Sequence, residues 1–217
     1  RVIHANVGTY RVSGGTLSEY VLNSTTVADR RPHVSSTVVR DEDLTTTLPE
    51  LVNNQYTHFF LSSSNTTNIF TGQADILPVS GGSQPYYNEF SGGVWQQSLL
   101  PVTEYMCVWL VALPVTDDLN SQQFRYLWIQ GQSAGSLEEQ QSLLPTSLNL
   151  SNLINLSPEF VFIDKVIIRF IGGNWQIISV ENILGNWFTS TTATAGNYLS
   201  IVNTDTTLSG TGTTTDP

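Results

Sequence analysis

The sequence predicts an all-β protein: an antiparallel β-sandwich with one short helix near residues 136–144 and an extended, Thr- and Gly-rich C-terminal linker. Three observations predict this class. About ten short runs rich in β-branched and aromatic residues follow one another closely, with turn-forming residues between them. A single stretch carries helix start and stop signals. No repeat of about 20 to 50 residues is detectable, which disfavours a propeller or a solenoid.

The N-terminal part of the chain alternates and turns often. Residues 8–12, followed by a Gly-Gly pair, predict a strand that enters a hairpin turn. Residues 41–54 are a possible helix weakened by Pro49, or else a loop that crosses one end of a sheet. Residues 56–62 predict a strand, and residues 69–77 are another strand candidate.

A long loop is predicted next, at residues 78–93, because two prolines and two Gly-Gly pairs fall within it. The apolar run at residues 105–113 is the strongest strand signal, and its continuity predicts burial on both faces. Residues 124–130 alternate between apolar and polar and predict a half-buried strand.

The C-terminal half contains the predicted helix and a hairpin. Ser136 and Glu139 have the spacing of a capping box, and a proline at position 145 ends the helix. Residues 160–171 predict a long strand that is bent or bulged near Asp164. A Gly-Gly-Asn turn then leads into an antiparallel strand at residues 175–180.

The composition is poor in charge and rich in neutral polar groups. Charged residues make up 12% of the chain, against about 25% in typical soluble domains. Thr, Ser, Asn and Gln account for 77 of the 217 residues, as is common in extracellular β-rich proteins and at virion surfaces. With a net charge of −10 and eight Lys and Arg residues along the whole chain, a nucleic-acid interface is not expected. The alternative interpretation of this net charge is that moderate acidity aids solubility.

No membrane insertion, cofactor or metal site is expected. The longest apolar run is too short to span a bilayer as a helix, and dinucleotide, phosphate-loop and His-Glu-x-x-His motifs are absent from the sequence. His4, His33 and His58 lie far apart, and we expect His58 to be half-exposed on its strand. Cys107, the single cysteine, lies in the apolar run and is expected to be a small buried hydrophobe.

Three acidic clusters are candidates for catalytic carboxylates: residues 41–43, 117–118 and 138–139. Glycoside hydrolysis needs two carboxyl groups that face each other across roughly 5 to 9.5 Å. Adjacent carboxylates on a turn are more often solvated than catalytic. We therefore assign no catalytic residue and expect a protein that is not an enzyme.

Aromatic residues are the better candidates for function. Tyr86, Tyr87, Phe90 and Trp95 lie in or beside the predicted Gly- and Pro-rich loop. Exposed aromatic faces stack on sugar rings, and neighbouring amide and carboxylate side chains can bind the hydroxyl groups. We therefore select these four residues as receptor or glycan contacts. The alternative is that Trp95 and one tyrosine fill the end of the sandwich or bury against a neighbouring subunit.

Two stretches resemble modules of bacteriophage tail-fibre and baseplate receptor-binding proteins. Residues 204–217 are similar to a fibre repeat in which Asp-x-x-Leu-x-Gly-x-Gly-Thr runs into Asp-Pro. Residues 124–183 resemble a fibre module in which a strand ends in Gly-Gln, a short helix follows, and Pro-Glu leads into a Gly-turn hairpin with a tryptophan, here Trp175. Both resemblances together cover less than half of the chain.

This resemblance implies a virion structural protein with a host-attachment or spacer role. Such proteins are usually homotrimers, so the expected partners are copies of the chain itself, other virion proteins and a host-surface glycan. We expect a β-sandwich domain at residues 1–188, with a possible subdomain boundary near 115–123. Residues 189–217 are expected to be a linker that leads into a further module. The alternatives are a glycan-degrading tailspike-type domain and a capsid decoration protein.

Overall fold

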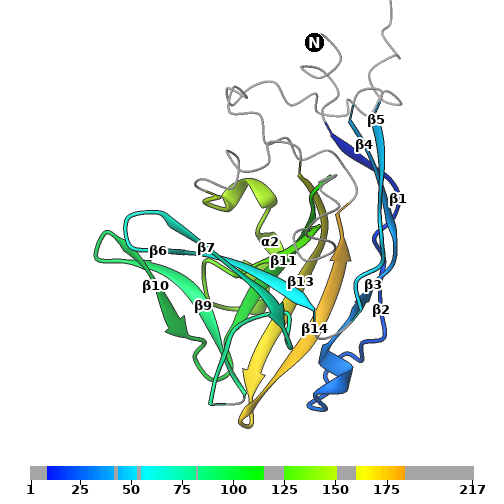
Figure 1. Ribbon diagram of the computed structural model, residues 1–217. Helices are drawn as coiled ribbons and strands as arrows, with labels where there is room; N and C mark the ends of the chain where they lie inside the picture. Colours follow the sequence, from blue (N-terminus) through cyan, green and yellow to red (C-terminus); the bar gives the residue numbers. More distant parts are fainter. Residues whose placement is uncertain are drawn as a thin grey trace, which may run out of the picture.

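The computed structural model describes residues 9–41, 44–52, 55–81, 83–114, 125–150 and 160–183. These residues form a β-sandwich-like, mainly antiparallel fold with one short α-helix, as the sequence predicts (Figure 1). The predicted linker at 189–217, the proposed boundary near 115–123 and His4 lie outside the described residues.

A six-stranded sheet forms the centre of the fold, in the order β14-β13-β11-β12-β6-β7. All neighbours in it are antiparallel except β12 and β6, which are parallel through the pairs Trp128 with His58 and Ile129 with Phe59. The bounds are β6 Tyr56–Ser62, β7 Thr66–Gln73, β11 Tyr105–Ala112, β12 Tyr126–Ile129, β13 Val161–Ile171 and β14 Asn174–Asn182.

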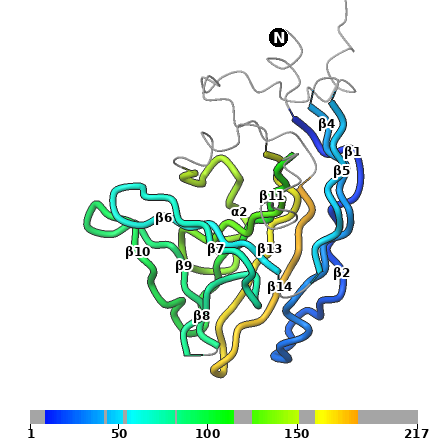
Figure 2. Tube along the Cα trace, viewed as in Figure 1, coloured from blue at the N-terminus to red at the C-terminus, as the bar shows by residue number. Residues whose placement is uncertain are grey.

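N-terminal strands cover one face of the central sheet (Figures 1 and 2). They form a three-stranded sheet, β1-β4-β5, and a two-stranded ribbon, β2-β3. Leu17, Val34, Val39, Leu48 and Leu51 of this layer share one buried cluster with β11, β13 and β14 of the central sheet. The bounds are β1 Tyr10–Gly14, β2 Leu17–Ser18, β3 His33–Val34, β4 Thr37–Asp41 and β5 Leu44–Leu48, with a 3-10 turn, η1, at Ala28–Arg30.

The helix α2 (Leu137–Ser142) and the 3-10 turn η3 (Pro145–Ser147) lie over the opposite face. Ser136 caps the helix as predicted, because its hydroxyl accepts from the Glu139 N–H while the Glu139 carboxylate accepts from the Ser136 N–H. Lys165, which is buried in the sheet, donates to the Gln141 and Leu143 carbonyls at the helix end. A cation at the C-terminal end of a helix interacts favourably with the helix dipole.

Several strand predictions are confirmed. The 105–113 run is β11, whose residues after Tyr105 are all buried. The 160–171 strand is β13, and its register against β11 shifts beside Asp164, so the predicted bulge is present. The Gly172-Gly173 turn joins β13 to β14 as an antiparallel hairpin.

Several predictions about local structure are wrong. The possible helix at 41–54 is instead the end of β4 and strand β5, because a run of β-branched threonines favours a strand. Residues 124–130 are fully buried at β12, since both faces of the central sheet are covered. The strand expected at 69–77 begins and ends earlier, as β7. His58 is buried rather than half-exposed.

The largest correction is at residues 78–93, which form strands and not a long loop. β8 (Val79–Ser80), β9 (Gln84–Ser91) and β10 (Val94–Leu99) make a three-stranded sheet in the order β10-β9-β8. Gly92 and Gly93 both have positive φ, at 59° and 84°, and lie between the paired residues Ser91 and Val94. Such a Gly-Gly pair suits a tight two-residue hairpin turn, which the sequence interpretation took for a loop.

Candidate functional site

The four selected aromatic residues lie on the β9–β10 hairpin, but they do not form one cluster. Phe90 pairs directly with Trp95, and Tyr86 lies four residues before Phe90 on the same strand. Because side chains alternate along a strand, Tyr86, Phe90 and Trp95 share one face of the hairpin and Tyr87 lies on the other. The hairpin therefore places Tyr86, Phe90 and Trp95 in one environment and Tyr87 in another.

Phe90 and Trp95 form an aromatic pair next to the Gly-Gly turn. Their ring centroids are 5.1 Å apart at an interplanar angle of 50°. Phe90 is 57% exposed, whereas Trp95 is only 8% exposed and belongs to the buried cluster under α2. Trp95 therefore holds the Phe90 ring in place, while the Phe90 ring itself remains exposed to solvent.

A cluster of side-chain amides lies beside this pair, and the sequence interpretation missed it. The Trp95 Nε1–H donates to Asn65 Oδ1 at 2.8 Å, and Asn149 Nδ2 donates to the same oxygen at 3.3 Å. Asn149 is held in turn by Gln132, whose side chain bonds both its N–H and its carbonyl. Asn65 has a φ of 90°, in the left-handed region that asparagine tolerates better than most residues.

Asn88 anchors the hairpin to the central sheet. Its side chain is fully buried. Oδ1 accepts from the Leu61 N–H at 2.7 Å and Nδ2 donates to the Leu61 carbonyl at 2.8 Å, so the amide makes the two backbone hydrogen bonds that a neighbouring strand would make. The Asn88 N–H also donates to the Gly131 carbonyl just beyond β12. Ser63 and Trp95 exchange backbone hydrogen bonds in both directions. The Phe90 ring is thus attached to a rigid part of the fold.

The two tyrosines are held by contacts within the protein. Tyr87 packs against the buried cluster that the N-terminal strands share with the central sheet, and it is hydrogen-bonded to Glu89. Burial, followed by the charge of Glu89, raises the pKa of the Tyr87 hydroxyl. The Ser98 hydroxyl and the Gln96 amide donate to Glu89 and lower the pKa of its carboxyl group. Tyr86 is half-buried, and its carbonyl accepts from Gln130 Nε2.

The acidic candidates that the structure describes have structural or surface positions, and Glu138 is exposed in the first turn of α2. Glu139 is committed to the helix cap, and Asp41 accepts from the Thr9 hydroxyl. Residues 42–43 and 117–118 lie outside the described residues. The described part of the chain holds no group of three or more His, Cys, Asp or Glu side chains that is suited to a metal ion.

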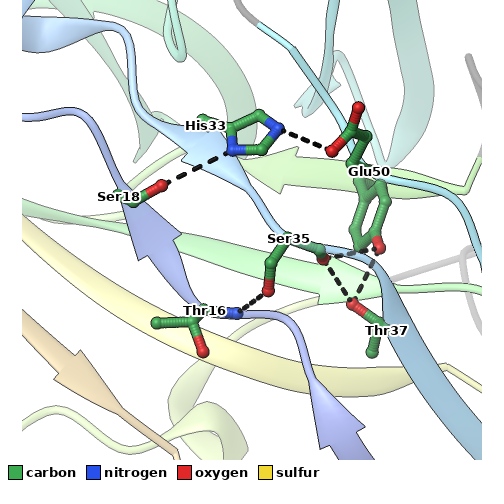
Figure 3. A network of polar contacts seen from close by, with 7 residues as sticks. Thr16, Ser18, His33, Ser35, Thr37 and Glu50 are labelled. Atoms are coloured by element: carbon green, nitrogen blue, oxygen red, sulfur yellow. Dashed lines mark hydrogen bonds and ion pairs between the residues drawn. The ribbon is translucent and has the colours of Figure 1, made fainter.

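His33 lies between a serine and a carboxylate, yet the arrangement is that of a surface network (Figure 3). Its Nδ1 is 3.5 Å from Ser18 Oγ, and its Nε2 is 3.4 Å from Glu50 Oε2. In a catalytic triad Nε2 faces the serine and a buried acid holds Nδ1. Here the order is reversed and the Glu50 side chain is 64% exposed, so the geometry does not activate Ser18.

The remaining members of this network stabilise the N-terminal layer and join it to the central sheet. The Tyr126 hydroxyl donates to Thr37 Oγ1 at 2.7 Å, and the Ser35 hydroxyl accepts from the Thr16 N–H at 3.0 Å. His58 is similarly structural, because its Nε2–H donates to the Asp75 carbonyl at 2.6 Å and burial lowers its pKa to about 4. Neither histidine is placed for catalysis.

No helix in the described part of the chain has the length and apolar character needed to cross a membrane. Comparisons with family models, curated proteins and solved structures found no match for this chain.

Proposed function

We propose that this chain is a non-enzymatic structural module of a viral particle, of the tail-fibre or baseplate type, which attaches to a host-surface glycan. The resemblance of residues 124–183 and 204–217 to phage fibre modules supports the proposal, as does an all-β fold with few charges. The site lies at the tip of the β9–β10 hairpin.

The observation that carries the proposal is the exposed Phe90 ring, held against a buried tryptophan beside a cluster of amides. A sugar ring presents an apolar face that an exposed aromatic ring covers, and its hydroxyl groups bond to amide side chains such as Asn65 and Asn149. Because Trp95 and Asn88 already fix the hairpin, binding orders few additional groups, and the entropic cost of binding is small.

A single exposed phenylalanine binds weakly, so we propose that attachment depends on several copies. In a homotrimer the same hairpin tip is presented three times, and linked weak sites gain avidity without any new contact. Light scattering on the chain, with and without residues 189–217, measures the number of copies. A monomeric mass for both forms would exclude the trimer while leaving the hairpin site untouched.

Glycan-array binding by the wild type and two variants tests the site. Phe90→Ala should abolish binding. Leu44→Ala is the control, because Leu44 is 68% exposed on β5 in the N-terminal layer, and it should retain binding. Equal binding by both variants would remove Phe90 from the site, and release of shortened sugars from the bound glycans would favour the tailspike-type alternative.

A further inference from the structure

One edge of the central sheet ends in a strand that has no outer partner strand in the described part of the chain. β7 is the outermost strand on that side, and β6 is its only strand neighbour among the described residues (Figure 1). Thr66 and Phe70 are exposed, and Phe70 stacks on Phe60 with ring centroids 5.3 Å apart. An unpaired edge of this kind is a template for another strand.

The hydrogen bonds of β6 show which backbone groups of β7 point outward. Phe59, Leu61 and Ser63 direct their N–H or C=O groups away from β7, toward Gln130, Asn88 and Trp95. The alternate residues of β6 therefore bond to β7, through the pairs His58 with Phe70, Phe60 with Asn68 and Ser62 with Thr66. It follows that the N–H and C=O groups of Thr67 and Ile69 point away from the sheet.

Between Thr66 and Phe70 the edge lacks two features that normally block pairing, and the register shift against β6 lies beyond Phe70. From Phe59 to Ala74 the chain contains no charged residue and no proline, although the protein carries a net charge of −10. Charged and proline residues are the usual protection of an edge strand. At the opposite edge, β14 carries Glu181, and its Ile177 carbonyl accepts from the Asn23 N–H.

We propose that β7 pairs with β7 of a second copy of this chain, antiparallel and about a two-fold axis at Asn68. In this register Thr67 lies opposite Ile69 of the other copy and Ile69 opposite its Thr67, so every outward N–H and C=O of these residues is bonded. A register centred on Thr67 pairs only one of these two residues within the strand. A register centred on Ile69 places Thr67 opposite Thr71, where the register shift against β6 interrupts the strand and the Thr71 carbonyl already accepts from Gln73 Nε2. The contact joins two six-stranded sheets into one continuous sheet.

Side chains agree with this register. Asn68 lies opposite its own copy across the axis, with its Nδ2 bonded within the chain to Ser62 Oγ and the Thr66 carbonyl. Phe70 lies opposite Thr66, which covers part of its exposed ring. No charge opposes another charge within the paired stretch. An edge contact of about five residues is small beside a stable interface, so it is effective where many chains are already held close together. It is independent of the hairpin site and of a three-fold assembly.

Register-specific disulfide trapping of the full chain tests the contact. Non-hydrogen-bonded antiparallel pairs have Cα atoms about 4.5 Å apart, within the range for a disulfide. Asn68→Cys should therefore form a covalent dimer on mild oxidation. Thr66→Cys is the matched control, because its two copies lie roughly 13 Å apart along the strand in this register, and it should stay monomeric. The native Cys107 is buried and does not interfere.

A second pair of variants keeps the test decisive if Asn68→Cys folds poorly. Thr66 and Phe70 lie opposite each other between copies, so a mixture of Thr66→Cys and Phe70→Cys chains should give mainly the mixed dimer. Equal cross-linking of Asn68→Cys and Thr66→Cys, or an absence of dimer from both Asn68→Cys and the mixture, would overturn the proposal.

Discussion

Asp164 should make the protein more stable in mild acid than at neutral pH. The carboxyl group is 2% exposed at the β13 bulge, and Asn182 Nδ2 donates to one of its oxygens, while the other has no hydrogen-bond partner. Burial raises the pKa of Asp164 from 3.8 to about 6, although Asn182 and the charge of Arg11 oppose the shift. The folded state therefore binds a proton that the unfolded state has released.

The size and sign of the effect follow from this difference in pKa. A raised carboxyl pKa gives stability that is fully present below pH 4 and is lost as the pH rises through about 6. A shift of this size corresponds to about 3 kcal/mol in the free energy of unfolding. Asp164→Asn removes the charge, so this pH dependence should disappear in the variant.

Urea denaturation of both proteins between pH 4 and 7.5 measures the effect. Groups other than Asp164 titrate in both proteins and cancel in the difference between their unfolding free energies. The new amide also lacks an acceptor, which costs about 1–3 kcal/mol at every pH. The test is therefore whether the difference between the two unfolding free energies changes with pH. A difference that stays constant from pH 4 to 7.5 would refute the reasoning.

Three further predictions concern structure and reactivity. Asn88→Ala should lower the unfolding free energy by about 2–4 kcal/mol, because it leaves the Leu61 N–H and C=O unpaired in a buried site; a loss below 0.5 kcal/mol in urea denaturation would contradict this. Ser136→Ala should cost about 1 kcal/mol by removing the helix cap that Glu139 completes, whereas Ser136→Asp should keep most of the stability in the same assay. Cys107 should not react with a thiol reagent in the folded state, because burial raises its pKa to about 12; labelling as fast as in denaturant would contradict its burial.

The fold class was predictable because strand patterns in this chain are strong wherever burial is deepest. The 105–113 run is apolar at almost every position, and β11 is indeed covered on both faces. The alternation at 124–130 was misleading because Gln130 is itself buried, with Nε2 bonded to Gln97 and to the Tyr86 carbonyl. A polar residue that is buried inside the protein cannot be distinguished in sequence from one on the surface.

The candidate site was predictable only in part. Once Gly92-Gly93 is recognised as a two-residue turn, the pairing of Phe90 with Trp95 follows from position alone. The contribution of Asn65 and Asn149 depends on tertiary contacts between segments that are distant in the chain. No local pattern in the sequence contains that information.

The parallel pairing of β12 with β6 has a consequence for how the chain acquires its structure. His58 and Trp128 are neighbours in the sheet although 70 residues separate them in sequence. During synthesis the β6–β7 hairpin is complete well before β12 exists, and contacts of such long range form slowly. Until then Phe59, which is fully buried in the finished fold, has no sheet partner on that side. We therefore expect the emerging chain to be most prone to aggregation at this stage.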